Sequence, residues 1–162
     1  MAKFPWSKPP ASRLGPLRAE HAEDCAAIHA ASFAHPWPAE DIEALLSGAN
    51  AFGAAALDPA TLELRGFALS RRAADEAEIL TIAAAPAWRR HGIGRELLGE
   101  HLRHAAMLGV RTVFLEVDPD NVAAMALYNR FHFYKVGERA GYYRRADGTL
   151  AGAWVMRRDL GG

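Results

Sequence analysis

The run Arg89-Arg90-His91-Gly92-Ile93-Gly94-Arg95 precedes the most regular segment of the chain. From Ile93 to Leu108 apolar residues recur at helical spacing, and Gly109 follows where such a helix would end. The start of a helix leaves backbone N–H groups unpaired and carries partial positive charge, and glycines let an anion approach the backbone. The run therefore predicts a phosphate-type anion site at a helix start, with Arg90 and Arg95 as counter-charges.

Other phosphate-binding motifs fit this run poorly. A Walker loop requires Gly-Lys followed by Ser or Thr, which the run lacks. A dinucleotide-binding loop requires a third glycine where Leu97 stands, and a tighter turn from strand to helix. The remaining alternative involves no ligand: two glycines soften the start of a helix that carries surface arginines.

The composition is that of an ordinary single-domain protein. Of the 162 residues, 51% are hydrophobic and 23% are charged, and the formal net charge is zero. This balance argues against a general nucleic-acid or membrane-surface binder, and no apolar run reaches the roughly 18 residues of a membrane helix. The single cysteine, Cys25, excludes an internal disulfide and a cysteine zinc cluster. We therefore expect a cytoplasmic protein without a metal site.

The first residues differ in composition from the rest of the chain. They contain Lys3, Lys8 and Arg13 but no acidic residue, and four prolines make an amphipathic targeting helix unfavourable. The apolar core of a signal peptide is also missing. We expect residues 1–12 to form a flexible tail and residues 13–162 to form a single domain.

Periodicity and turn signals predict alternating helices and strands over the rest of the chain. The expected helices cover residues 20–33, 38–47, 93–108 and 122–131. The expected strands cover residues 13–19, 50–57, 62–71, 77–84, 110–117, 133–145 and 149–157. Early helices, a strand meander and then alternating strands and helices indicate a mixed α/β sheet.

With these elements in place, the run around Gly92 matches the acetyl-CoA motif Gln/Arg-x-x-Gly-x-Gly/Ala. The chain resembles the GNAT N-acetyltransferase superfamily, and within it the RimI-like branch of bacterial ribosomal-protein alanine N-acetyltransferases. Further pieces occur in the family's order and spacing from about residue 32 to residue 156. They are His35-Pro36-Trp37, Asp75-Glu76-Ala77, Thr81-Ile82-Ala83, Leu115-Glu116-Val117, Asn121-Val122-Ala123-Ala124, Ala126-Leu127-Tyr128 and Tyr142-Tyr143.

The resemblance implies an α/β (α+β) GNAT fold with a mixed, mostly antiparallel central sheet of roughly six to seven strands and helices on both faces. It implies direct transfer of the acetyl group of acetyl-CoA to an amine. The first expectation is a protein or peptide N-terminal α-amine, with a ribosomal-protein alanine as the first guess. The alternatives are a small-molecule amine, an amino acid or a lysine side chain, and, from another class, a non-catalytic acyl-CoA-binding module.

The resemblance also assigns the cofactor contacts by position. The pantetheine arm is expected along a splayed central strand, the pyrophosphate on the glycine loop, and a further contact at the start of the helix that follows residue 121. Neither a metal nor direct contact with nucleic acid or membrane is implied. The expected cofactor-binding residues are Ile82, Ala83, Ala84, Arg89, Arg90, His91, Gly92, Ile93, Gly94, Arg95 and Asn121.

Glu116 and Tyr128 are the candidates for proton transfer. An ammonium must lose a proton before it attacks a thioester, and the departing thiolate gains one. Strand alternation places Glu116 on the face of Phe114, where it serves as the family's general base or, alternatively, faces solvent or pairs with an arginine. Tyr128 lies about two helical turns after Asn121 and is either the family's acid or a core tyrosine.

Four residues are candidates for the acceptor side, namely His35, Trp37, Tyr142 and Tyr143. In the family these regions border the acceptor, whereas a packed indole and packed strand residues are the alternatives.

Two further features concern histidines. His132 stands where the family usually has a glycine after a helix, so the helix end is expected to be strained or rearranged. His101 and His104 lie three residues apart, and a solvated helix face explains this spacing better than a metal site.

Overall fold

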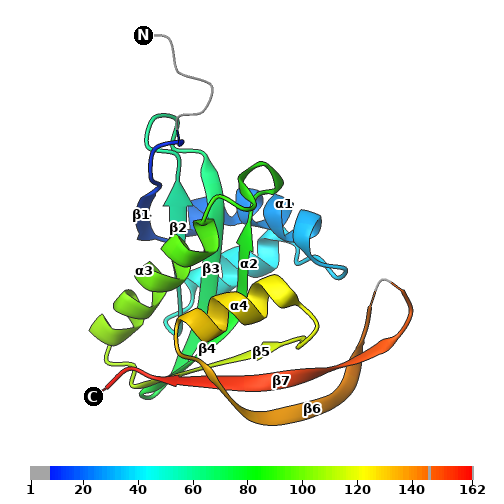
Figure 1. Cartoon of the computed structure of the whole chain (residues 1–162). Coiled ribbons are helices and arrows are strands. Elements are labelled where there is room, and N and C mark those ends of the chain that lie inside the picture. The colour runs from blue at the N-terminus through cyan, green and yellow to red at the C-terminus, as the bar shows by residue number, and fades with distance from the viewer. Residues whose placement is uncertain (1–7, 146, 162) are drawn as a thin grey trace.

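The computed structural model describes residues 8–145 and 147–161, although not the side chains of Tyr142 and Tyr143. Every element expected from the sequence is present (Figure 1). In chain order the elements are β1 (Arg13–Pro16), a 3₁₀ turn (Ala19–His21), α1 (Ala22–Ser32), α2 (Ala39–Ser47), β2 (Ala51–Leu57), β3 (Leu64–Ala73), β4 (Glu76–Ala84), a second 3₁₀ turn (Pro86–Trp88), α3 (Ile93–Met107), β5 (Thr112–Val117), α4 (Val122–Arg130), β6 (Tyr134–Arg144) and β7 (Leu150–Asp159).

The strands form one seven-stranded sheet in the order β1-β2-β3-β4-β5-β7-β6. Only β4 and β5 run parallel, and α3 provides the crossover between them. All other neighbouring strands are antiparallel. The predicted mixed, mostly antiparallel α/β sheet is therefore confirmed.

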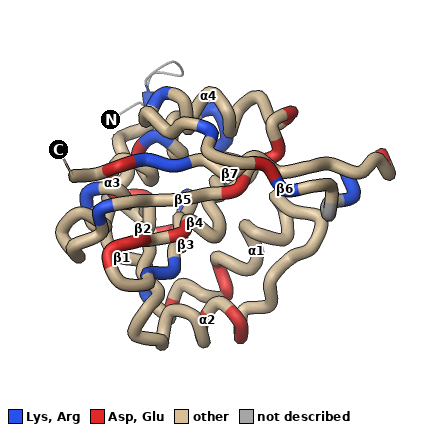
Figure 2. The backbone as a smooth tube through the Cα atoms, turned by 90° about the horizontal axis from the view of Figure 1, so that it is seen from below, with Lys and Arg blue, Asp and Glu red and all other residues tan. Residues whose placement is uncertain are grey.

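Helices cover both faces of this sheet. Seen from below, α1 and α2 lie on one side of the strands, and α3 and α4 lie on the other (Figure 2). Successive side chains of β3 point to opposite faces of the sheet, so Phe67 packs toward α1 and α2 whereas Ala68 packs toward α3. A Cβ on Gly66 would lie 2.7 Å from the carbonyl oxygen of Ala83 and 2.8 Å from Cγ2 of Ile93, so glycine lets α3 lie close to the sheet.

The central parallel pair is short, and its end creates a fork in the sheet. β4 and β5 pair only from Glu76 with Thr112 to Ile79 with Leu115. The register between β3 and β4 shifts at the same level, which leaves Leu80 as an extra residue in β4. Beyond this bulge β4 and β5 separate, and a gap opens between two strands of an otherwise continuous sheet.

Several element boundaries differ from those predicted. β1 ends at Pro16 rather than near residue 19, and a 3₁₀ turn delays the start of α1 to Ala22. β5 starts at Thr112 rather than Val110. Within the part of the chain that the structure describes, no helix has both the length and the apolar character to cross a membrane.

The interpretation of His101 as part of a solvated helix face is wrong. Its side chain is only 1% exposed, its ring stacks on Phe52 with centroids 4.8 Å apart, and Nε2 lies 2.5 Å from Oγ of Ser70. Burial, with a smaller contribution from His104, lowers the pKa of His101 from 6.5 to about 3. α3 therefore presents a neutral histidine to the core beside its apolar stripe.

The end of α4 is strained, as the sequence predicts. The chain leaves the helix through His132, whose φ of 62° lies in the left-handed region. The N–H of Phe133 then donates to the carbonyl oxygen of Tyr128 at 3.0 Å, which closes the helix end.

We expect His132→Gly to stabilise the protein by about 1 kcal/mol, because glycine adopts this backbone conformation without a Cβ clash. Urea unfolding measures the effect. Asn129→Gly is the matched control, since it places glycine inside the helical part of α4 and should destabilise by about 1 kcal/mol. A loss of stability in both variants would contradict the strain at His132.

Acid should destabilise the protein through His101. Below about pH 6.5 the unfolded chain binds a proton that the folded protein does not bind until about pH 3, so stability is lost as the pH falls through this window. Between about pH 6.5 and about pH 5.5 this group should cost about 1 kcal/mol. Urea unfolding of the native chain and of His101→Gln should show that difference, and identical pH profiles would refute it.

Candidate active site

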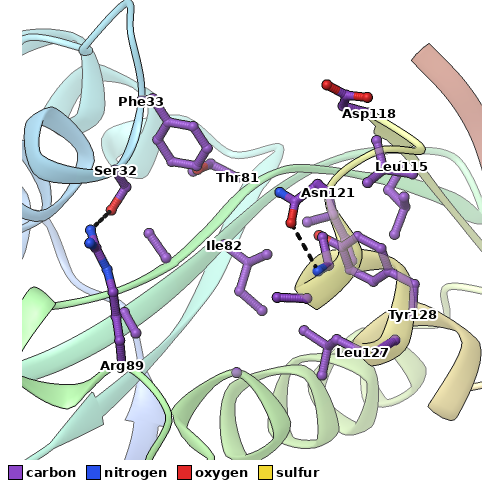
Figure 3. A pocket seen from close by; sticks show the side chains of 18 of the residues that line it. Ser32, Phe33, Thr81, Ile82, Arg89, Leu115, Asp118, Asn121, Leu127 and Tyr128 are labelled. Carbon is purple, nitrogen blue, oxygen red and sulfur yellow. Dashed lines mark hydrogen bonds between the residues drawn. The ribbon is translucent and has the colours of Figure 1, made fainter. Parts of the chain in front are cut away.

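A cavity of about 950 Å³ lies in the fork between β4 and β5 (Figure 3). β4 forms one wall, the end of β5 and α4 form another, and the loop into α3 closes one end. Nearly all the expected cofactor residues line it. They are Ile82, Ala83, Ala84, Arg89, Arg90, Gly92, Ile93, Gly94, Arg95 and Asn121.

The β4 wall offers backbone groups to a ligand. After Ile79, β4 pairs with β3 alone, so its other edge faces the cavity. Ile82, Ala83 and Ala84 lie on this stretch. An extended chain that carries amide groups, such as a pantetheine arm, can pair with such an edge as an added strand does.

The two glycines of the loop serve different purposes. Gly92 has a φ of 77°, and a Cβ there would meet no atom within 4 Å, so the residue is required for its backbone conformation. Gly94 lies close to α4, because a Cβ there would be 3.2 Å from Cδ2 of Leu127, a tight contact that the leucine side chain would have to relieve. Gly92 is the N-cap of α3 without a side-chain cap, so the first N–H groups of α3 remain available to an anion.

The cavity is strongly basic. Arg89 donates to the carbonyl oxygen of Ala31 at 2.9 Å and to Oγ of Ser32 at 3.3 Å, which ties the loop to the end of α1. Arg90 and Arg95 line the cavity beside it. Sequence reasoning missed three further arginines that the fold brings to the same cavity, namely Arg130, Arg144 and Arg145. This concentration of positive charge suits a ligand with several phosphates.

His91 is the expected cofactor residue that does not line the cavity. Its ring packs edge-on against Trp88 with centroids 5.4 Å apart, and Nδ1 lies 2.8 Å from the carbonyl oxygen of Arg89. The side chain therefore helps to shape the loop from outside.

The turn before α4 forms a further part of the wall. Asn121 is the N-cap of α4, and its side-chain oxygen accepts from the N–H of Ala124 at 3.1 Å (Figure 3). Asp118 accepts from Nε and Nη2 of Arg145 at 3.0 and 3.1 Å, and Arg145 also pairs with Asp120 at 2.7 Å. These bonds fasten the β6–β7 hairpin to the turn, and they hold the pKa of Asp118 below its usual value.

Glu116 stands where two hollows meet. Buried residues alternate with more exposed ones along β5, which places Glu116 on the face of Phe114 as predicted. Leu115 and Glu116 line both the main cavity and a second hollow of about 360 Å³ bounded by β3, β4, β5, β6 and β7. Oε1 of Glu116 lies 2.7 Å from Nε of Arg139, so the carboxylate is paired while it borders both spaces.

Tyr128 enters the cavity from α4 and is 7% exposed. Its ring packs edge-on against Phe133 with centroids 5.8 Å apart. Burial raises the pKa of Tyr128 to about 12, so the phenol keeps its proton at neutral pH. Asn121, Tyr128 and Leu115 converge on the same part of the cavity (Figure 3).

The structure does not bring the first two acceptor-side candidates to the cavity. His35 is exposed, and Trp37 stacks on His29 with centroids 4.7 Å apart. Ser32 and Phe33 at the end of α1 line the cavity instead, which nothing in their local sequence indicated. The side chains of Tyr142 and Tyr143 lie outside the described part of the structure.

Comparisons with known proteins agree with this architecture. Residues 20–133 match the model of the acetyltransferase (GNAT) family. The chain is 39% identical over 154 residues to the N-alpha-acetyltransferase RimI of Mycobacterium tuberculosis. This alignment covers 91% of this chain and 92% of that protein. The crystal structure of the ribosomal-protein-S18-alanine N-acetyltransferase from Escherichia coli superposes with a TM-score of 0.85 at 26% identity, over 93% of this chain and 95% of the other.

A more distant structure shares the fold alone. Arabidopsis thaliana NAA60 in complex with acetyl-CoA superposes with a TM-score of 0.78 at 22% identity, over 93% of this chain and 99% of that one. The match over most of the chain, together with the forked sheet and the glycine loop, places this protein in the GNAT family of acetyltransferases.

The family defines the donor. The chain is an N-acetyltransferase that takes its acetyl group from acetyl-CoA, and the forked sheet with its basic loop suits a long ligand with phosphates at one end. Among residues 8–145 and 147–161, no three histidine, cysteine, aspartate or glutamate side chains come together in a way that would hold a metal ion.

Proposed function

We propose that the chain acetylates the N-terminal α-amine of a protein, with an alanine of a ribosomal protein as the first acceptor to test. The similarity to an N-alpha-acetyltransferase over nine-tenths of both chains supports the class of acceptor. The similarity to the Escherichia coli enzyme for ribosomal protein S18 supports the choice of alanine. In this proposal Glu116 is the general base and Tyr128 the general acid.

The observation that carries the proposal is the place of Glu116 between two hollows. Acetyl-CoA occupies the main cavity, with its pyrophosphate at Arg89–Arg95, its pantetheine arm along β4, and Asn121 at its side. The second hollow lets an acceptor approach Glu116 from the face of Phe114, opposite Val113 and Leu115, which pack toward α3. In this arrangement the donor and the acceptor occupy different cavities and come into contact at Glu116.

The chemistry follows from direct attack. Glu116 takes a proton from the ammonium of the acceptor, and the neutral nitrogen attacks the thioester carbon. A carbon–nitrogen bond forms, the carbon–sulfur bond breaks, and the electron pair of that bond leaves with the sulfur. The nitrogen loses its second proton to solvent as the amide forms, and Glu116 later releases the first proton to solvent as well. The pairing with Arg139 at 2.7 Å keeps the carboxylate of Glu116 in place for the first step.

Tyr128 supplies the second proton in this scheme. With its pKa raised to about 12, the phenol remains protonated until a thiolate forms beside it. Proton transfer from Tyr128 turns the leaving thiolate into a neutral thiol, and solvent returns the proton to the phenolate.

Two rival functions remain distinguishable from this one. The same site can serve a small amine or a lysine side chain, because the proton transfers are identical. A non-catalytic acyl-CoA-binding module would need only the loop and the β4 edge. The presence of Glu116 and Tyr128 in the same cavity as the loop argues against that module.

Glu116→Gln should lower kcat by roughly 100-fold and leave the KM for acetyl-CoA nearly unchanged, because the amide occupies the same space but accepts no proton. Tyr128→Phe should lower kcat by a similar factor of roughly 100. Thiol release from acetyl-CoA with an N-terminal alanine peptide measures both effects.

The matched controls are a paired carboxylate and a tyrosine outside the cavity. Glu100→Gln removes a carboxylate that pairs with Arg103 on α3, and Tyr134→Phe removes a hydroxyl that donates to Asp159. Both control variants should retain native turnover. Native turnover in Glu116→Gln and Tyr128→Phe would show that the assigned roles are wrong.

The acceptor class can be tested with three kinds of substrate. We expect thiol release with a peptide that begins with a free alanine, and none when the same N-terminus is blocked and only a lysine is offered. Small amines should react poorly, because they do not fill the second hollow. Release with small amines alone would refute the peptide acceptor, and acetyl-CoA binding without release across the panel would show that the acceptor belongs to another chemical class.

A further inference from the structure

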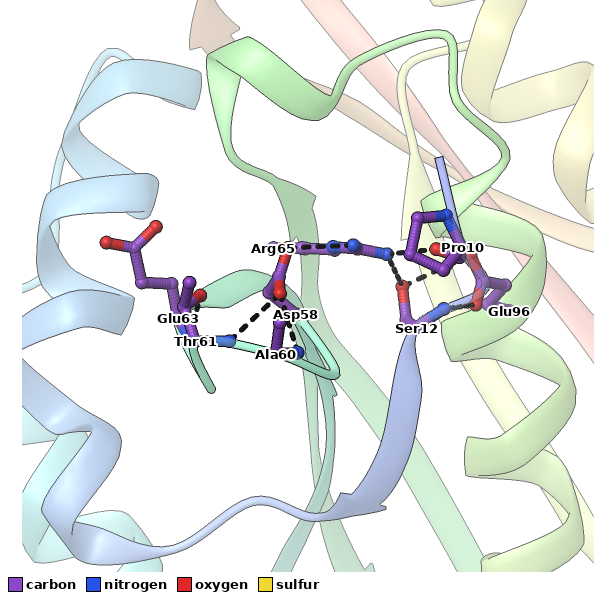
Figure 4. Close-up of polar contacts among 8 residues, drawn as sticks. All are labelled: Pro10, Ser12, Asp58, Ala60, Thr61, Glu63, Arg65 and Glu96. Carbon is purple, nitrogen blue, oxygen red and sulfur yellow. Dashed lines mark hydrogen bonds and ion pairs between the residues drawn. The ribbon is translucent and has the colours of Figure 1, made fainter. Parts of the chain in front are cut away.

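Arg65 is a cation buried inside the domain, on β3 and beside the cofactor loop. Its side chain is 2% exposed, and burying a charge is costly unless the charge is paired. Among the described residues Nη1 and Nη2 find partners, whereas Nε is buried without a hydrogen bond. Nη2 donates to Oδ2 of Asp58 at 2.9 Å, and Nη1 donates to the carbonyl oxygen of Pro10 at 2.8 Å and to Oγ of Ser12 at 3.2 Å (Figure 4). Residues expected to be a tail therefore contact the core through Arg65.

Arg65 also holds the beginning of the cofactor loop. Its guanidinium lies over the indole of Trp88, with Cζ 3.9 Å from the ring centroid. Its carbonyl oxygen accepts from the N–H of Ala85 at 2.8 Å. Ala85 and Trp88 belong to the short segment between β4 and the run Arg89–Arg95, so both the backbone and the side chain of Arg65 fix the point where this run begins.

Ser12 holds the end of the same loop. Its N–H donates to Oε2 of Glu96 at 2.9 Å and its hydroxyl to Oε1 at 3.3 Å (Figure 4). Glu96 lies in the first turn of α3, immediately after Arg95. Because the Ser12 hydroxyl also accepts from Arg65, one connected set of contacts joins Trp88 before the run to Glu96 after it. We call Ser12, Asp58, Arg65, Trp88 and Glu96 the Arg65 brace.

The loop between these two anchor points has a costly backbone conformation. Arg90 has a φ of 63° and Gly92 a φ of 77°, and a residue other than glycine pays for this left-handed geometry. A loop held in such a conformation before the ligand arrives loses less freedom on binding. Anchoring both ends is the simplest way to maintain it.

We propose that Arg65 is a positioning residue for acetyl-CoA, and that Pro10 and Ser12 complete the support of the pyrophosphate loop. The proposal rests on the assignment of the pyrophosphate to Arg89–Arg95. Trp88 lines the cavity, whereas Ser12, Asp58, Arg65 and Glu96 do not, so four of the five brace residues support the loop from outside the cavity. The effect of the brace is therefore expected in the affinity for the donor and not in the chemical step.

Variants of the full-length chain test the brace. Ser12→Ala removes the hydroxyl that joins Arg65 to Glu96, and it should weaken acetyl-CoA binding by about fivefold. Arg65→Lys keeps the charge but loses the planar fork, and it should weaken binding by about tenfold. Isothermal titration of acetyl-CoA measures both, and kcat at saturating acetyl-CoA should stay within about twofold of the native value.

Two controls separate positioning from loss of stability. Ser12→Thr retains the hydroxyl and should restore native affinity. Ile42→Val, in the core on the side of α1 and α2, lowers stability without touching the loop and should bind acetyl-CoA as the native chain does.

This test compares dissociation constants for acetyl-CoA, and their measurement requires no acceptor. The result is therefore independent of which amine the enzyme acetylates. Weaker acetyl-CoA binding by Ser12→Ala and Arg65→Lys, together with native binding by Ile42→Val, supports the positioning role of the brace. If Arg65→Lys does not fold, the affinity of Ser12→Ala decides the question. Native affinity in Ser12→Ala, or an equal loss in Ile42→Val, overturns it. Native chain that binds acetyl-CoA but acetylates no peptide would instead count against the proposed acceptor.

Discussion

The separation of β4 from β5 is the constraint on which the candidate site depends. The two strands share a register only as far as Ile79 and Leu115, and the extra residue Leu80 ends that pairing. An unpaired strand edge inside a protein is costly, since its N–H and C=O groups lose their partners. Here the edge faces a cavity, so a ligand with amide groups can supply those partners.

Much of this arrangement could be predicted from the sequence because its determinants are local. The apolar stripe of α3, the glycines before it and the Asn121 cap each act within a few residues, and they appear where expected. Alternation along β5 placed Glu116 on the correct face for the same reason. The strain at His132 also followed from a single residue type at a helix end.

What could not be predicted depends on contacts between distant segments. From its local sequence Arg65 is simply a charged residue in a predicted strand. Nothing near it in the sequence indicates that Pro10 and Ser12 accept hydrogen bonds from its side chain. The expected start of the domain at residue 13 therefore misses contacts that only the fold creates. Similarly, Phe33 lines the cavity while Trp37 packs on His29, and both contacts join residues that nothing in the local sequence brings together.

The two hollows that meet at Glu116 have a kinetic consequence. Among the described residues they share only Leu115 and Glu116, so in the proposed arrangement the donor in one and the acceptor in the other occupy different spaces. Both substrates can therefore be bound at once, which favours a ternary complex over a ping-pong cycle with an acetylated enzyme. In such a complex no acetyl group is ever held on the protein, so the enzyme is ready for the next donor once both products have left.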